Sequence, residues 1–232
     1  MTEIAIDLDA TLEFLCDLLE LPSPTGFTEN AIAFVEGALS PFPVSMHQTL
    51  KGALVVTWEG ESADEPRALT AHVDTLGAMV SELKENGRAK LTQIGGYMWN
   101  AVEGEGVTVH TADGSAFRGT ILTTKSSVHA YGKESAELER KAENMELRLD
   151  LRATKSEDLR AVGIEVGDFV SLDPRVEVTD TGFIRSRHLD DKAGVACIYG
   201  ALKALVDAGL SHSKRTYPAP TNNGLGGWSD LL

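Results

Sequence analysis

A histidine and three carboxylates occupy positions that suit a metal-dependent hydrolase. His72 and Asp74 come at the end of an apolar segment, and the adjacent Asp190 and Asp191 open a helical pattern much later in the chain. An imidazole and a carboxylate that converge on two closely spaced divalent ions can hold a bridging water and make it a nucleophile near neutral pH. These residues predict one half of a two-metal hydrolase site, and no other segment of the sequence supplies the second half.

The spacing of these residues indicates a role for each. Side chains two apart on a strand face the same side, so Asp74 can hold and orient the imidazole of His72. Neighbouring side chains on a helix point about 100° apart, so one aspartate can reach a metal while the other faces the helix terminus. We expect Asp190 to be the ligand and Asp191 to serve the helix start. The alternatives are a hydrogen-bonded surface pair at 72–74 and simple helix capping by both aspartates.

The elements that must position this site are α/β in character. Leucines at helical spacing predict a first helix over about 8–20, and a second follows over about 28–39. Segments 52–58 and 68–72 then predict strands of a buried sheet. Residues 190–208 predict a further helix with a face of small residues suited to close packing.

The segment between these elements has a different texture. Short alternating stretches such as 107–110, 120–122 and 168–172 are separated by glycine turns, which predicts a small β-rich barrel or sandwich. We therefore expect an α/β domain over 1–76 and 179–210, interrupted by a β-rich insertion over 77–178. The tail, 211–232, has two prolines and several glycines without helix or strand period, and is predicted to be irregular.

Composition excludes several classes of function. Of 232 residues 35 are acidic and 21 basic, which gives a formal net charge of −14 and argues against a nucleic-acid partner. No apolar run approaches the roughly 20 residues needed to span a bilayer, and no signal-peptide pattern opens the chain, so we expect a cytoplasmic protein without membrane contact. Cys16 and Cys197 lie in helical patterns among apolar neighbours and are expected to be buried free thiols.

Four segments together resemble the M42 family of metallo-aminopeptidases, the glutamyl and tetrahedral aminopeptidase group. They occur in the family's order and cover roughly residues 10–208. The matching segments are Leu21–Gly26 (LPSPTG), Ala71–Gly77 (AHVDTLG), Gly163–Asp168 (GIEVGD) and Ser186–Gly194 (SRHLDDKAG).

The resemblance implies a fold and a mechanism. It implies a zinc-peptidase-like α/β catalytic domain whose β-rich insertion serves oligomer assembly, and a homo-oligomer that removes N-terminal residues from peptides. By the same resemblance His72 is a ligand of one zinc or cobalt ion, Asp74 is the supporting acidic residue, and Asp190 bridges the two metals.

The sequence departs from the family pattern after these segments. The family then uses an adjacent Glu-Glu pair, one as general base and one as ligand, followed by an Asp and a late His, but this sequence has no Glu-Glu. His212 is the one histidine that follows Asp190, and it matches no family motif. Catalytic zinc takes at least three protein ligands, so we expect a C-terminally truncated or frame-shifted relative that is inactive alone.

Two other functions remain open. The stretch Ile4–Thr11 (IAIDLDAT) resembles the haloacid-dehalogenase signature, in which Asp7 would be a phosphoryl nucleophile and Asp9 the acid/base. The leucine period already includes Leu8, which favours a helix start there instead. The second alternative is a non-catalytic oligomerisation module built on the insertion.

Overall fold

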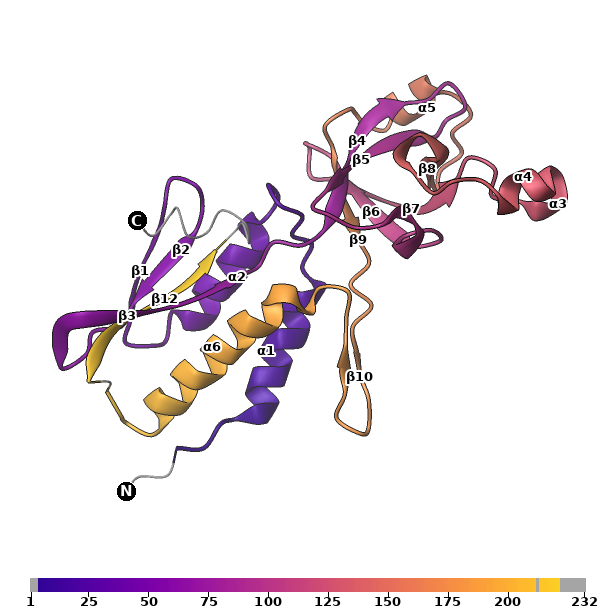
Figure 1. Ribbon diagram of the computed structural model, residues 1–232. Coiled ribbons are helices and arrows are strands. Elements are labelled where there is room, and N and C mark those ends of the chain that lie inside the picture. Colours follow the sequence, from indigo (N-terminus) through magenta and orange to yellow (C-terminus); the bar gives the residue numbers. More distant parts are fainter. Residues whose placement is uncertain (1–3, 212, 222–232) are drawn as a thin grey trace. The chain divides into compact units, whose positions relative to one another are not determined.

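The computed structural model describes residues 4–211 and 213–221 and divides into two compact units. The first unit comprises the chain up to Thr75 and from Pro174 onward, and we call it the α/β unit. The second comprises Leu76–Asp173, and we call it the barrel unit (Figure 1). The predicted architecture, an α/β domain interrupted by a β-rich insertion, is thus the observed one.

The α/β unit packs three helices against its strands. Its core is formed by the apolar faces of the helices together with buried strand residues such as Leu54, Val56, Ala71 and Val73. The helices are α1 (Leu8–Glu20), α2 (Glu29–Leu39) and α6 (Leu189–Asp207). The strands are β1 (Ser45–Gln48), β2 (Leu54–Thr57), β3 (Ser62–His72), β10 (Glu177–Val178), β11 (Ile184–Arg185) and β12 (Lys214–Thr221).

Helices α1 and α6 lie side by side, and the small residues of α6 explain how closely (Figure 1). A Cβ atom added at Gly200 would lie 2.6 Å from Oγ1 of Thr11 on α1, so only glycine fits at this crossing. The predicted close packing is therefore found at Gly200. The expectation of a buried Cys197 is wrong, because Cys197 lies on the exposed side of the same helix.

The expectation of an irregular segment over 211–232 is wrong for Lys214–Thr221, which forms β12. This strand pairs in parallel with β3, from Thr216 opposite Arg67 to Thr221 opposite His72. It is the returning strand that a parallel sheet needs after helix α6. Residues 212 and 222–232 of the predicted tail lie outside the described part of the chain.

Two prolines explain why the sequence pattern concealed β12. Proline lacks the N–H that a sheet ladder requires, so its presence argues against a strand. On one side of β12, Thr216 exchanges backbone hydrogen bonds of 2.9 and 3.0 Å with Trp58. Pro218 and Pro220 follow at two-residue intervals, and alternate residues of a strand direct their backbone groups to the same side. Both missing donors therefore lie on the Trp58 side, and the β3 side is intact.

Strand β3 is longer and more exposed than predicted. It begins at Ser62, and most of its side chains are exposed, including Leu69 at 47%. Within the described part of the chain it pairs only with β12, which leaves its other edge without a partner strand. The expectation of burial is met at its end, where Ala71 enters the core just before His72.

The barrel unit is a closed barrel with strand order β4-β5-β8-β7-β6-β9. Alternate residues such as Val107, Val109 and Val170 fill its interior, as strand alternation predicts. The strands are β4 (Gly77–Leu83), β5 (Ala89–Ile94), β6 (Gly106–His110), β7 (Ala116–Thr123), β8 (Met145–Leu149) and β9 (Phe169–Leu172). Short helices α3 (Val128–Tyr131), α4 (Lys133–Ala136) and α5 (Ser156–Arg160) join them, with 3-10 turns at Trp99–Ala101 and Ala142–Asn144.

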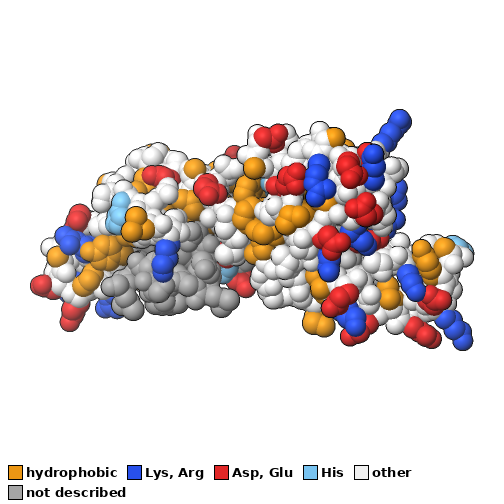
Figure 2. Space-filling model, turned by 90° about the horizontal axis from the view of Figure 1, so that it is seen from above, with side chains coloured by type: hydrophobic (Ala, Val, Ile, Leu, Met, Phe, Trp, Pro, Cys, Tyr) orange, Lys and Arg blue, Asp and Glu red, His pale blue; other side chains and the backbone are white. Residues whose placement is uncertain are grey.

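The barrel unit ends at Asp173 rather than at residue 178, because β9 completes the barrel and β10 pairs with β11 in the α/β unit. On the face seen in Figure 2, its acidic and basic side chains are interspersed. Among the described helices, none combines the length and the apolar character needed to cross a membrane.

Candidate metal centre

The structure brings together the two predicted metal ligands. Atom Nε2 of His72, at the end of β3, lies 3.3 Å from Oδ1 of Asp190, at the start of α6. The side chain of His72 is 24% exposed, whereas that of Asp190 is 96% exposed. The imidazole is thus held at the rim of the core, and the carboxylate approaches it from the solvent side.

Asp74 holds the opposite edge of the same ring. Its Oδ1 atom lies 2.9 Å from Nδ1 of His72, and its backbone oxygen lies 3.2 Å from the same nitrogen. The hydrogen bond to the Asp74 carboxylate is the main reason that the pKa of His72 is raised to about 9, and burial of the ring opposes this shift. With Nδ1 committed to Asp74, it is Nε2 that faces Asp190.

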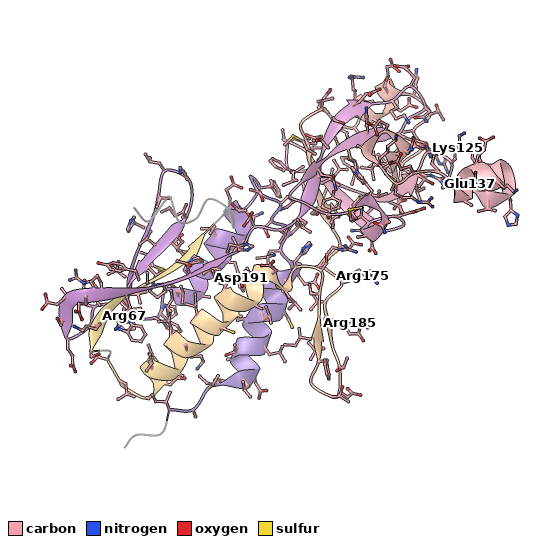
Figure 3. All side chains as sticks on the ribbon, viewed as in Figure 1. Arg67, Lys125, Glu137, Arg175, Arg185 and Asp191 are labelled. Atoms are coloured by element: carbon pink, nitrogen blue, oxygen red, sulfur yellow. The ribbon has the colours of Figure 1, made fainter. Side chains whose placement is uncertain are left out.

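The Asp191 carboxylate lies over the start of its own helix, and its charge makes a small contribution to the raised pKa of His72. The backbone at Asp190 and Asp191 is not helical and the peptide bond between them is cis, so regular helix begins at Lys192. A Cβ atom at Gly194 would lie 2.4 Å from Oδ1 of Asp191, which places this carboxylate over the first turn of α6. Figure 3 shows Asp191 at that end of the helix. The two adjacent carboxylates therefore have different neighbours: that of Asp190 approaches His72, and that of Asp191 lies over the first turn of α6.

The arrangement fits part of a metal site. A ligating histidine typically has its other ring nitrogen bound to a carboxylate, and the pair His72–Asp74 has this form. Asp74 lies behind the ring, so only Nε2 of His72 and the Asp190 carboxylate converge. Within residues 4–211 and 213–221, no group of three His, Cys, Asp or Glu side chains is placed to hold a metal ion.

A loop after α1 supports the strand end that carries His72 and Asp74. Ser23 is buried, its Oγ donates to the backbone oxygen of Val73 at 2.8 Å, and its own backbone oxygen accepts from the N–H of Thr75. Oγ1 of Thr25 donates to Oδ2 of Asp74 at 2.5 Å. The loop thus contacts both the backbone of this strand end and the side-chain carboxylate of Asp74.

Lys192 connects the same loop to the start of α6. Its side chain is fully buried, and Nζ donates to the backbone oxygens of Leu18 and Leu21 at 2.8 and 2.7 Å. Burial lowers the pKa of this amine to about 7. The lysine therefore ties the C-terminal end of α1 to the turn that carries Asp190 and Asp191.

Sequence reasoning missed these supporting residues. Ser23, Thr25 and Lys192 have no chemical signature of their own, and their contacts join parts of the chain that are far apart in sequence. The available signal was their position, since all three lie inside the segments that resemble the M42 family.

The phosphatase alternative does not agree with the structure. Asp7 is not at the end of a strand but caps α1, because its Oδ1 accepts the backbone N–H of Ala10 at 3.0 Å. That hydrogen bond, with a further one from Lys203, lowers the pKa of Asp7. Asp9 lies in the first helical turn. Neither carboxylate is in the strand-end position that the haloacid-dehalogenase signature requires.

A known protein family matches most of this chain. The family model described as M42 glutamyl aminopeptidase matches residues 52–223. A Bacillus subtilis (strain 168) protein with the name "Putative aminopeptidase YhfE" is 44% identical over 224 residues, or 95% of this chain. The chain spans 64% of the length of that relative.

Solved structures share the fold. The TET aminopeptidase from the marine sediment archaeon Thaumarchaeota archaeon SCGC AB-539-E09 superposes with a TM-score of 0.86 at 22% identity, over 96% of this chain and 62% of that one. The Pyrococcus horikoshii TET1 peptidase gives a TM-score of 0.76 at 23% identity, over 95% of this chain and 64% of that one. From the family match and the 44% relative together, this chain belongs to the M42 glutamyl aminopeptidase family.

Proposed function

We propose that this chain contributes two ligands, His72 and Asp190, to the two-metal centre of an aminopeptidase that removes N-terminal residues from peptides. The observation that carries the proposal is the 3.3 Å approach of His72 Nε2 to Asp190 Oδ1, with Nδ1 of the same ring bound to Asp74. The aminopeptidase names of its relatives support the choice of substrate class.

The residues of the chain have separate tasks in this proposal. Asp74 fixes the imidazole and keeps Nε2 of His72 directed outward, and Asp190 supplies a carboxylate that can bridge two ions. Zinc or cobalt would suit these nitrogen and oxygen donors. Such ions supply, when bound, a water acidic enough to serve as a nucleophile near neutral pH.

The described residues do not complete this centre. Catalytic zinc takes three protein ligands, and the described part of the chain offers two that converge. The sequence also lacks an adjacent Glu-Glu pair that would supply a general base. We therefore propose that the 232-residue chain binds metal weakly and does not hydrolyse peptides by itself.

A combined binding and activity assay tests this function. The purified chain is titrated with zinc or cobalt by calorimetry and then assayed with aminoacyl p-nitroanilides at saturating metal. We expect weak metal binding and no turnover above a metal-only blank. Turnover would contradict the proposed inactivity, and the absence of any metal binding would contradict the proposed site.

We also propose that the barrel unit mediates self-association. A closed barrel has no free strand edge, so contacts between copies must use side chains on its outer surface. Exposed apolar residues of this unit include Met98, Val128 and Tyr131, the last two on the α3 helix labelled in Figure 1. The related Pyrococcus horikoshii TET1 peptidase can assemble into a tetrahedron or a large octahedral shell.

Light scattering after size-exclusion chromatography tests the assembly. We expect the native chain to be larger than a monomer and Val128→Glu to reduce its mass. Val178→Glu is the matched control, because Val178 is also exposed but lies in the α/β unit. A monomeric native chain, or equal masses for the Val128 variant and the native chain, would contradict this proposal.

A further inference from the structure

The strand end that carries His72 and Asp74 is held from a second segment of the chain. An isolated parallel bridge joins Pro24 to Thr75, just beyond β3. Ser23 donates to the oxygen of Val73 and accepts from the N–H of Thr75, at 2.8 Å in both cases. The backbone on either side of Asp74 is thus fixed relative to the loop, and the loop itself needs no regular secondary structure to do so.

These hydrogen bonds place the hydroxyl of Thr25 against the Asp74 carboxylate. Oγ1 of Thr25 lies 2.5 Å from Oδ2, while Oδ1 of the same carboxylate lies 2.9 Å from Nδ1 of His72. The side chain of Asp74 is 10% exposed, so little water is available to replace a missing partner. Each carboxylate oxygen therefore has its own protein donor, and the two donors fix the rotation of the carboxylate.

We infer that Thr25 is a positioning residue for the metal centre: its hydroxyl orients the Asp74 carboxylate, which in turn orients the imidazole of His72 toward Asp190. This inference rests on the proposed function for its catalytic meaning, but the hydrogen-bonded chain is a property of the fold. Outer partners of a metal-binding histidine typically affect metal affinity by about 10- to 100-fold. Thr25 is one step further out than Asp74, so its effect belongs at the lower end of this range.

Three variants of the full chain separate orientation from simple destabilisation. Thr25→Val removes the hydroxyl and keeps the shape of the side chain, and Thr25→Ser keeps the hydroxyl. Thr28→Val is the matched control, because Thr28 is buried three residues further on and its side chain makes no capping hydrogen bond to α2. Denaturant unfolding of all three confirms that the variants compared are folded.

The first measurement needs no metal. In a chain labelled with 15N-histidine, the Nδ1 proton of His72 is hydrogen-bonded to Asp74, and its exchange with water is followed by NMR. We expect Thr25→Val to accelerate this exchange several-fold, while Thr25→Ser and Thr28→Val behave like the native chain. Equal exchange in the folded Thr25→Val and Thr28→Val variants would overturn the inference.

The second measurement is the dissociation constant for Co²⁺ alone, from calorimetry or visible absorption. We expect Thr25→Val to raise it by roughly tenfold, with Thr25→Ser restoring most of the affinity. An unchanged constant in Thr25→Val would overturn the inference. If the native chain binds no Co²⁺ while the exchange result is as expected, the proposed metal site fails and the positioning role of Thr25 stands.

Discussion

Nε2 of His72 lies 3.3 Å from Oδ1 of Asp190, although the barrel unit separates the two residues in the sequence. Both belong to the α/β unit, so their approach is a property of that unit alone. The insertion leaves the unit after β3 and returns before α6, and the site forms where the end of β3 meets the start of α6. This meeting is the basis of the proposed metal centre.

At the crossing of α1 and α6, the effect of Gly200→Ala on the free energy of unfolding should change sign when Thr11 is replaced as well. Gly200→Ala places a methyl group against Thr11, whose Oγ1 is held by the backbone oxygen of Asp7 at 2.7 Å. Overpacking costs about 1–3 kcal/mol and should outweigh the gain of roughly 1 kcal/mol in helix propensity. In the Thr11→Ala background the clash is absent, so the same substitution should stabilise. Urea unfolding measures both, and additive effects would show that the contact is not close.

Replacing Lys192, which lies in the α/β unit, should lower the free energy of unfolding. Lys192→Met keeps an apolar stem but leaves the backbone oxygens of Leu18 and Leu21 without this donor. The Leu18 oxygen keeps the N–H of Leu21 as a donor at 3.3 Å. The Leu21 oxygen loses the Lys192 donor, and because an unsatisfied buried acceptor costs about 1–3 kcal/mol, the free energy of unfolding should fall by this order. Lys203→Met, which removes a partly exposed lysine paired with the exposed carboxylates of Asp7 and Asp207, should have a smaller effect. Equal stability of the Lys192 variant and the native chain would contradict this role.

Because of His110, we expect the free energy of unfolding of the barrel unit to fall in acid. Its Nε2 lies 2.8 Å from Oγ of Ser171, and burial lowers the pKa of the ring below its usual 6.5. Well above pH 6.5 the ring of His110 is neutral in both the folded and the unfolded state. As the pH falls below 6.5 the unfolded chain takes up a proton that the folded chain resists, so stability is lost.

The urea midpoint measured between pH 7 and pH 5 checks this sign. His110→Gln should make the midpoint less sensitive to acid than in the native chain, whereas His47→Gln, at an exposed position on β1, should not. If the native chain and the His110 variant lose stability in parallel over this range, the ring of His110 is not the group responsible.

Local patterns predicted most of the helices and strands. The leucine period of α1, the alternation of the barrel strands and the small face of α6 depend on neighbours in sequence. Residue type and position at the ends of elements, together with the resemblance to a family, predict that His72 meets Asp190.

The features that sequence did not predict depend on pairing across long separations. β12 forms because its two prolines fall on the side away from β3, and no local propensity encodes that choice of side. Thr25 and Lys192 are polar residues whose roles come from partners 49 and 171–174 positions away. Their burial and contacts are set by tertiary structure.

The most direct test of the metal centre compares Co²⁺ binding to the native chain with binding to His72→Ala, Asp190→Asn and Asp191→Asn. Asp190 is exposed and Asp191 faces the first turn of α6, so the first two variants should abolish binding while Asp191→Asn retains most of it. Calorimetry compares the four proteins under identical conditions. Native affinity in the His72 or Asp190 variant would contradict the account.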